Sequence, residues 1–536
     1  MFIVLLLLTA MTVSAQPLTY PPTRRVDVKD TIHGRVIADP YRWLENDRDP
    51  EVEQWVAEQA AITESYLSRI PYRAPLLARI DALTNFERYS QPWHRAGRTF
   101  FYKNDGRQDH SVLYVQEDGA STPEVLLDPN TFSADKTVSL AFADESDDGR
   151  YLAFGKSEGG SDWRDIYVMD LTTRKLLPDV IRGVKNGGVN WYRNGFYYSK
   201  WDANPGAEKS LTEKNAVQTV YYHTLGTDQK EDVVVFRDPS APEQFVGCYV
   251  LENSRYLIRW VRKASVRGSH IFIRPVDDPN APWKELYRSD EFSFWPRHDE
   301  NGVLYGVTDE NAPNKRVVRV TDPLGTPRFE TIVPEGADVI DGLSFGAGRM
   351  FVTRMKDVHH VVEMMDLNGR SMGTIGLPGL GTVGGFSGQP TDTTLYYTFT
   401  SYTYPTTIFS YDVRSGRSTV WHAAKAPFDP ADFTAEQVFA TSKDGTKVPM
   451  FVLSKKGRKR DGTAPTILYG YGGFNVSLAP SFNPNHIAWL EQGGVMVIAN
   501  LRGGDEYGER WHEAGTKTKK QNVFDDAVAC AEWLIA

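Results

Sequence analysis

Seven repeated strand pairs between residues 86 and 428 constrain the fold more than any other feature of this sequence. Each repeat has an aromatic-rich strand, a polar turn and a second strand that often ends in Asp or a Gly-containing turn. The repeats recur at roughly 45 to 60 residues, the length of a four-stranded propeller blade. The pairs are residues 98–103 with 111–116, 150–155 with 165–171, 195–201 with 219–225, 255–262 with 269–276, 303–307 with 316–321, 350–355 with 361–367 and 395–400 with 407–413.

We therefore predict a seven-bladed β-propeller over residues 86–428. Blade signatures such as Trp-Asp do not recur at regular positions in this region. An irregular pair of β-sandwiches is for this reason the alternative fold.

The segment before the propeller, residues 16–85, shows a helical pattern instead. Residues 51–70 place apolar side chains at spacings near 3.6, after an Asp49-Pro50 start signal. We predict a helical segment that packs with the C-terminal region.

Residues 429–536 change pattern again and predict the beginning of an α/β-hydrolase domain. Residues 436–441 and 447–454 form a hairpin across Lys443-Asp444-Gly445. The apolar runs 466–468 and 495–499 are bounded by glycines, as expected of buried parallel strands. In a final helix, Asp525 and Asp526 suit the positive N-terminal end, and the predicted buried stripe is Phe524, Ala527, Val528, Ala531, Leu534 and Ile535.

The N-terminus predicts a secretory signal over residues 1–15. Its apolar run is too short to span a bilayer, and Val13 and Ala15 supply the small residues of a cleavage site before Gln16. No Lys or Arg precedes the apolar run, so either the true start lies upstream or the signal is atypical. We expect export to the periplasm or the medium, and no membrane association after the signal is removed.

Charge and cysteine content exclude several classes of function. A net charge of -9 over 536 residues provides no basic face for nucleic acid. The two cysteines, Cys248 and Cys530, make no disulfide framework and lie in no His/Asp/Glu cluster of metal spacing. We expect buried thiols, no metal and no cofactor.

Six motifs are spread along essentially the whole mature chain: residues 39–45 (DPYRWLE), 160–163 (GSDW), 442–446 (SKDGT), 469–475 (YGYGGFN), 500–508 (NLRGGDEYG) and 520–526 (KQNVFDD). Together they resemble the prolyl oligopeptidase family of serine peptidases. The resemblance implies a propeller that restricts access to a hydrolase active site. It also implies cleavage of short peptides on the carboxyl side of proline. The Gly-Gly-Phe-Asn ending is similar to the prolyl-specific branch, and we expect a monomer.

The resemblance also implies roles for three residues. Tyr471 would donate a hydrogen bond to the oxyanion, as acyl transfer requires. Phe474 would form one wall of an apolar pocket for the proline ring, and Asn475 would belong to the same substrate site. The alternative is that Tyr471 and Phe474 are core aromatics beside a strand. Asn186 stands where the family often has an aromatic residue of the substrate site, which leaves specificity beyond proline open.

The catalytic triad is not found in these residues. A G-x-S-x-G nucleophile elbow occurs nowhere in the 536 residues, and none of the eleven histidines can be assigned as the base. We expect the serine, the acid and the histidine to lie beyond Ala536, so that this chain is inactive as it stands. A non-catalytic, propeller-based peptide-binding or scaffold protein is the second hypothesis.

Overall fold

A computed structural model describes residues 18–46, 49–185, 187–202, 217–263 and 266–536 of the chain. The described residues divide into two compact units, with the boundary between Arg79 and Ile80. The predicted signal, residues 1–15, and Asn186 lie outside the described residues. None of the described helices combines the length and the apolar character that a membrane span requires.

The first unit contains a hairpin as well as the predicted helix. Strands β1 (Lys29–Ile32) and β2 (Arg35–Ala38) pair antiparallel across His33 and Gly34, both at positive φ as a two-residue hairpin turn requires. The helical prediction for residues 16–85 missed this hairpin. The helices are α1 (Pro50–Leu67), capped by Asp49, and α2 (Arg73–Thr84). The predicted packing of this segment with the C-terminal region stays a prediction.

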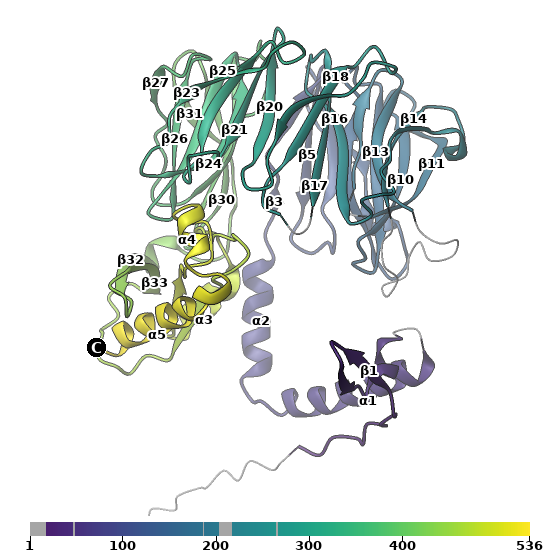
Figure 1. The fold of residues 1–536 in the computed structure, drawn as a ribbon. Coiled ribbons are helices and arrows are strands. Elements are labelled where there is room, and N and C mark those ends of the chain that lie inside the picture. Colours follow the sequence, from purple (N-terminus) through teal and green to yellow (C-terminus); the bar gives the residue numbers. More distant parts are fainter. Residues whose placement is uncertain (1–17, 47–48, 186, 203–216, 264–265) are drawn as a thin grey trace, which may run out of the picture. The chain divides into compact units, whose positions relative to one another are not determined.

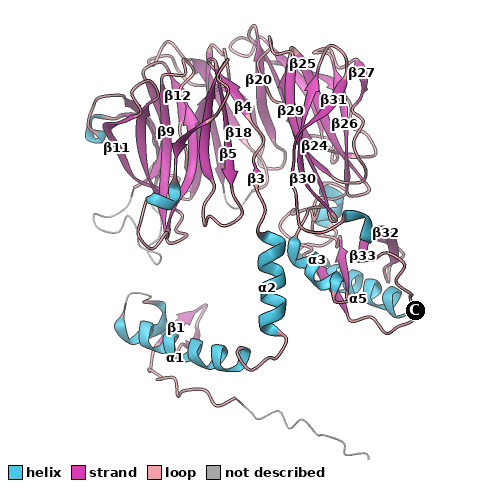
Figure 2. Ribbon diagram, turned by 180° about the vertical axis from the view of Figure 1, so that it is seen from behind, coloured by secondary structure: helices cyan, strands magenta, loops and turns pink. Residues whose placement is uncertain are grey.

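Seven antiparallel sheets stand side by side around a common axis in the second unit (Figures 1 and 2). Each is a meander in which sequence neighbours pair. In blade 1, the short strand β3 adds a further pairing to β5. The propeller prediction is confirmed, and the β-sandwich alternative is wrong.

The strands are as follows. Blade 1 has β3 (Arg88–Tyr89), β4 (Trp93–Arg95), β5 (Arg98–Asn104), β6 (Val112–Glu117) and β7 (Glu124–Leu127); blade 2 has β8 (Val138–Glu145), β9 (Tyr151–Glu158), β10 (Trp163–Asp170) and β11 (Lys175–Lys185). Blade 3 has β12 (Asn190–Tyr192), β13 (Gly195–Trp201), β14 (Gln218–Thr224) and β15 (Val233–Phe236); blade 4 has β16 (Gln244–Val250), β17 (Tyr256–Lys263), β18 (His270–Pro275) and β19 (Lys284–Arg288). Blade 5 has β20 (Phe294–Glu300), β21 (Val303–Thr308), β22 (Arg316–Thr321) and β23 (Arg328–Val333); blade 6 has β24 (Val339–Gly346), β25 (Arg349–Lys356), β26 (His359–Met365) and β27 (Ser371–Thr374). Blade 7 has β28 (Thr382–Gly385), β29 (Thr394–Ser401), β30 (Tyr404–Asp412) and β31 (Arg417–Ala423).

Aromatic rings stack both within and between blades. Phe386 of blade 7 stacks on Phe351 of blade 6 at 4.8 Å and on Tyr397 of its own blade at 4.6 Å, centroid to centroid. All three side chains are buried. Such pairs add to the free energy that comes from burying their area, so the blades are joined by the residues that define the repeat.

A buried histidine links blade 2 to blade 3. Nδ1 of His223, on β14, lies 2.7 Å from Asp232 of blade 3, and its Nε2 lies 3.0 Å from Asp179 of blade 2. All three side chains are almost completely buried. Burial alone would lower the pKa of His223, but the two carboxylates outweigh burial and the pKa is raised. Two carboxylate partners require a donor at each ring nitrogen, so the imidazolium is the form that fits.

The C-terminal region is a mixed α/β layer. The sheet order is β32 (Phe433–Thr441), β33 (Lys447–Lys455), β35 (Val495–Ala499) and β34 (Thr466–Gly470). The last two strands are parallel, as predicted, with Gly470 opposite Ala499. The helices are α3 (Pro484–Glu491), α4 (Glu509–Glu513) and α5 (Gln521–Ile535).

The predicted buried stripe of the last helix is confirmed only in part: Ala527 and Leu534 pack against the core, and three other predicted residues do not. Phe524, Val528 and Ile535 are exposed, whereas Val523, Asp526, Ala529 and Cys530 are the buried residues of α5. This orientation of α5 buries Asp526 beneath the sheet, where its carboxylate forms an ion pair with a cationic side chain. Both thiols are free; Cys530 is buried, as expected, and Cys248 is half-buried.

That cation is Arg502, on the loop after β35. Its Nη2 and Nε lie 2.6 and 2.9 Å from the two oxygens of Asp526, whose side chain is completely buried. Its Nη1 contacts Asp444, and its backbone N–H donates to Asp526 at 3.1 Å. The hydrogen bond from Arg502 lowers the pKa of Asp444 to about 2. The hairpin, the loop and α5 are thus held together by one guanidinium.

We predict that His223→Gln lowers the free energy of unfolding by about 3 to 5 kcal/mol, because two buried carboxylates lose their shared cation. The folded-state pKa of His223 is above its unfolded value of about 6.5, so this contribution is complete below about pH 6.5 and is lost as the pH rises through the folded-state pKa. Urea unfolding at several pH values measures the difference. The exposed His94→Gln is the control, and a difference that grows with pH would contradict the prediction.

Arg502→Met should destabilise the C-terminal region by about 3 to 5 kcal/mol, because Asp526 would stay buried without a counter-charge. The change can be followed by hydrogen exchange of α5 amides under mild urea. Arg510→Met, at an exposed position on α4, provides the control. Equal protection of α5 in the two variants would show that Arg502 does not hold the helix.

Candidate active site

The loop of residues 470–476 lies at the carboxyl edge of the parallel strands β34 and β35. Ligands of α/β sheets bind at this edge, because the loops that follow parallel strands converge there. The backbone N–H of Asn475 donates to the carbonyl of Gly503 at 3.1 Å, so the loops after the two strands are in direct contact. The motif residues Tyr471, Phe474 and Asn475 all belong to this loop.

The backbone of the loop is strained and closely packed. Gly472 has φ +61°, and a Cβ there would lie 2.5 Å from Cγ1 of Val523 on α5. Phe474 and Asn475 follow with φ of 54° and 59°, in the left-handed region that side chains other than glycine rarely adopt. Such a conformation persists only when the surrounding contacts fix it.

The aromatic side chains of the loop face outwards. Tyr471 is 46% exposed and Phe474 is 86% exposed, and their ring centroids are 6.4 Å apart. Neither ring belongs to the core of the described residues, and the roles assigned to them stay predictions. Asn475 is also exposed, so the three predicted residues are near one another and accessible.

One polar side chain contacts this loop directly, and two others contact the neighbouring segments at Gly503 and Leu478. The ammonium of Lys520, just before α5, donates to the carbonyl of Gly472 at 2.7 Å. Nδ1 of His512 lies 2.8 Å from the carbonyl of Gly503. Glu506, buried, accepts from the N–H of Leu478 at 3.0 Å, and burial raises the pKa of this carboxyl group.

Lys520 and Glu506 lie in two of the sequence motifs, but no role was predicted for either residue. One signal was available for Lys520, since a lysine is unfavourable before a helix N-terminus.

The described part of the chain contains no assembled nucleophile and base. No serine or cysteine side chain there is hydrogen-bonded to a histidine. No group of three or more His, Cys, Asp and Glu in that part could hold a metal ion. The site therefore offers a phenol hydroxyl and an exposed aromatic ring, but no group to attack a carbonyl carbon.

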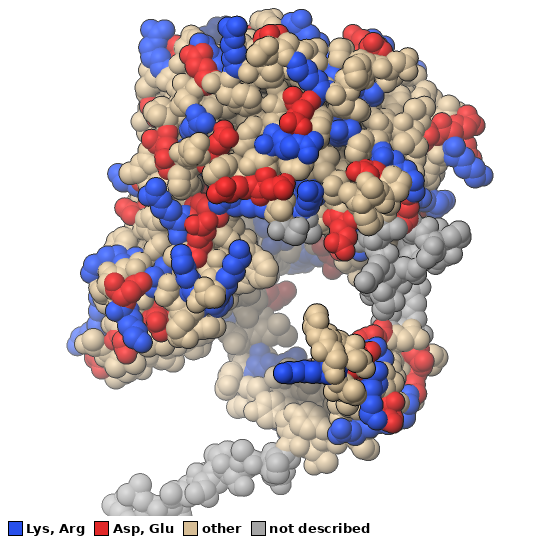
Figure 3. Space-filling model, in the orientation of Figure 1, with Lys and Arg blue, Asp and Glu red and all other residues tan. Residues whose placement is uncertain are grey.

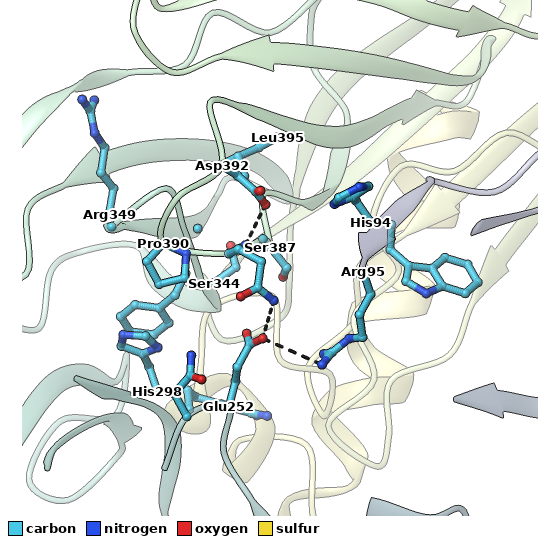
Figure 4. A pocket seen from close by; sticks show the side chains of 18 of the residues that line it. His94, Arg95, Glu252, His298, Ser344, Arg349, Ser387, Pro390, Asp392 and Leu395 are labelled. Carbon is cyan, nitrogen blue, oxygen red and sulfur yellow. Dashed lines mark hydrogen bonds and ion pairs between the residues drawn. The ribbon is translucent and has the colours of Figure 1, made fainter. Parts of the chain in front are cut away.

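A large cavity lies elsewhere, at one end of the propeller. Its volume is about 800 Å³, and the turns between the first and second strands of six blades line it. Figure 4 shows Arg95 facing Glu252 across this cavity, at 3.9 Å, and Arg95 also lies 3.1 Å from Glu145. The C-terminal region contacts the opposite end of the blades, through turns between second and third strands such as Lys315 with Asp505 at 3.0 Å.

Two family models match this chain. The model described as "Prolyl oligopeptidase, N-terminal beta-propeller domain" matches residues 21–424, and the model "Prolyl oligopeptidase family" matches residues 480–536. The hydrolase part of the family is thus only partly present in these 536 residues.

Curated relatives and solved structures agree with these matches. A prolyl endopeptidase of Elizabethkingia meningoseptica is 40% identical over 521 residues, which cover 96% of this chain and 73% of the relative. A dual function macrocyclase-peptidase of Galerina marginata is 29% identical over 558 residues, covering 97% of this chain and 76% of the relative.

A structure from a study of two prolyl endopeptidases matches with a TM-score of 0.90 at 37% identity, covering 96% of this chain and 76% of that one. Prolyl oligopeptidase B of Galerina marginata, bound to a 25mer macrocyclization substrate, matches with a TM-score of 0.88 at 27% identity, covering 97% and 77%. The chain belongs to the prolyl oligopeptidase family.

Proposed function

We propose that this chain is the N-terminal part of an exported serine peptidase that cleaves short peptides after proline. The observation that carries the proposal is the exposure of Tyr471 and Phe474 on a fixed loop at the carboxyl edge of parallel strands. A hydroxyl held in this way can donate to an oxyanion that forms at the edge. The exposed ring of Phe474 supplies an apolar wall on which a proline ring can stack.

The remaining roles fall to residues that these 536 do not contain. The serine would attack the carbonyl carbon with a histidine as its base, and the backbone N–H after the serine would be the second oxyanion donor. The propeller would admit short peptides and exclude folded proteins, and the enzyme would act as a monomer. Figure 3 shows both signs of charge mixed on the viewed face, which suits neutral peptides better than nucleic acid.

A chain of residues 17–536 should show no peptidase activity, since an oxyanion donor alone cannot form an acyl-enzyme. A chain extended through the G-x-S-x-G elbow and the histidine should hydrolyse a chromogenic Gly-Pro substrate. The measurement compares the two chains after equal purification. Proline-specific turnover by residues 17–536 would contradict the prediction that the nucleophile lies beyond them. Binding of proline peptides without turnover by the longer chain would favour the non-catalytic hypothesis instead.

In the longer chain, Tyr471→Phe should lower kcat by about 10- to 1000-fold, the range for losing one oxyanion donor. KM should change much less, because the hydroxyl acts mainly in the transition state. Steady-state kinetics with the same substrate measures both constants. Tyr469→Phe, at an exposed tyrosine two residues earlier, is the matched control. An unchanged kcat with a raised KM would assign Tyr471 to substrate binding.

A further inference from the structure

Lys520 stands where a lysine is electrostatically unfavourable. It occupies the N-cap position of α5 without capping the helix through its side chain, and no acidic residue lies in the first turn. Two more lysines, Lys517 and Lys519, precede it. Cations near a helix N-terminus oppose the helix dipole, and the residues that favour this position are Ser, Thr, Asp and Asn. The stability of α5 therefore does not explain this residue.

The ammonium of Lys520 is instead directed at the loop of Tyr471. It donates to the carbonyl of Gly472, the residue after Tyr471, at 2.7 Å. Among the described residues, the side chain of the neighbouring Lys519 makes no hydrogen bond to this loop. A residue that breaks a local rule of helix design but makes a specific contact is expected at a functional site.

The first turns of α5 make two further contacts, one with the loop of Tyr471 and one with the loop that follows β35. Val523 packs so closely on Gly472 that a Cβ there would lie 2.5 Å from it. Asp526 binds Arg502 directly before Gly503, whose carbonyl accepts from the N–H of Asn475. Three successive turns of one chain segment thus fix the strained residues that follow Tyr471.

We propose that Lys520 is a positioning residue, which holds the loop of residues 470–476 so that the hydroxyl of Tyr471 points at the oxyanion. The catalytic effect of Lys520 rests on the proposed function. Its contact with the loop does not depend on that function and can be tested without it. Removing the ammonium frees the carbonyl of Gly472 while the helix loses an unfavourable charge. The amides of the loop should then exchange faster, while the stability of the whole fold stays unchanged.

The first experiment needs no activity. In the 536-residue chain, Lys520→Met should speed hydrogen exchange of the Asn475 and Val476 amides, which are bonded within the site, by about 3- to 10-fold. Lys519→Met, the matched control, removes the same charge from the same helix end and should leave these amides unchanged. Lys520→Arg should retain part of the protection. The urea midpoint should be unchanged or higher in both Met variants.

Unchanged exchange in Lys520→Met would overturn the proposal. So would a lower urea midpoint with faster exchange throughout α5, since Lys520 would then support the helix rather than the loop.

The second experiment uses the longer chain that carries the nucleophile. Lys520→Met should lower kcat by about 3- to 30-fold, because a misplaced catalytic group costs rate even where the group itself remains. KM should stay within about twofold, and Lys519→Met should match the wild type. A raised KM with unchanged kcat would overturn the positioning role. If the wild-type longer chain does not cleave after proline, the proposed function fails, while the exchange measurement still decides the role of Lys520 in the loop.

Discussion

The buried contact between Arg502 and Asp526 is the interaction on which the C-terminal region depends. Neither charge could be buried alone, because the cost of desolvation would exceed what the region can supply. Together they form a bidentate ion pair, in which Nη2 and Nε of Arg502 lie 2.6 and 2.9 Å from the carboxylate oxygens of Asp526. Asp444 accepts a hydrogen bond from the same guanidinium. The pair fixes the loop after β35 on α5. The loop of Tyr471 contacts that loop through Asn475 and the start of α5 through Gly472. The geometry of the site is thus set by one helix rather than by the sheet edge alone.

How far the sequence predicts the fold depends on the position of each strand in its blade. All seven predicted pairs are the second and third strands, such as β21 and β22, which are paired on both sides and buried on both faces. Such strands are rich in apolar residues and stand out from the polar turns. The fourth strands are edges, and β27 and β31 are largely exposed. Because most of their side chains face solvent rather than a core, these strands show no hydrophobic pattern from which they could be predicted.

The parts of the site formed by residues close in sequence could be predicted, whereas the contacts between residues far apart in sequence could not. The run from Tyr471 to Asn475 follows a strand and contains its own glycines, so its position at the sheet edge could be inferred from neighbouring residues. Asp526 was interpreted as a partner of the helix dipole, because its true partner, Arg502, lies 24 residues earlier. That ion pair also explains the wrong part of the predicted stripe on α5, since burying Asp526 turns Phe524 and Val528 outwards. Hydrophobic periodicity cannot show that a carboxylate belongs to the buried face.

The contact between the propeller and the C-terminal region includes ion pairs and hydrogen bonds. Arg267 lies 2.6 Å from Glu509, and the hydroxyl of Tyr507 donates to Asp357 at 3.1 Å. The buried rings of Tyr402, on blade 7, and Phe451, on β33, lie 5.0 Å apart, centroid to centroid, so the contact also has an apolar part. Lys520 and Val523, which contact Gly472, both lie within the C-terminal region. The geometry of the loop of Tyr471 therefore depends on contacts inside that region rather than on the propeller.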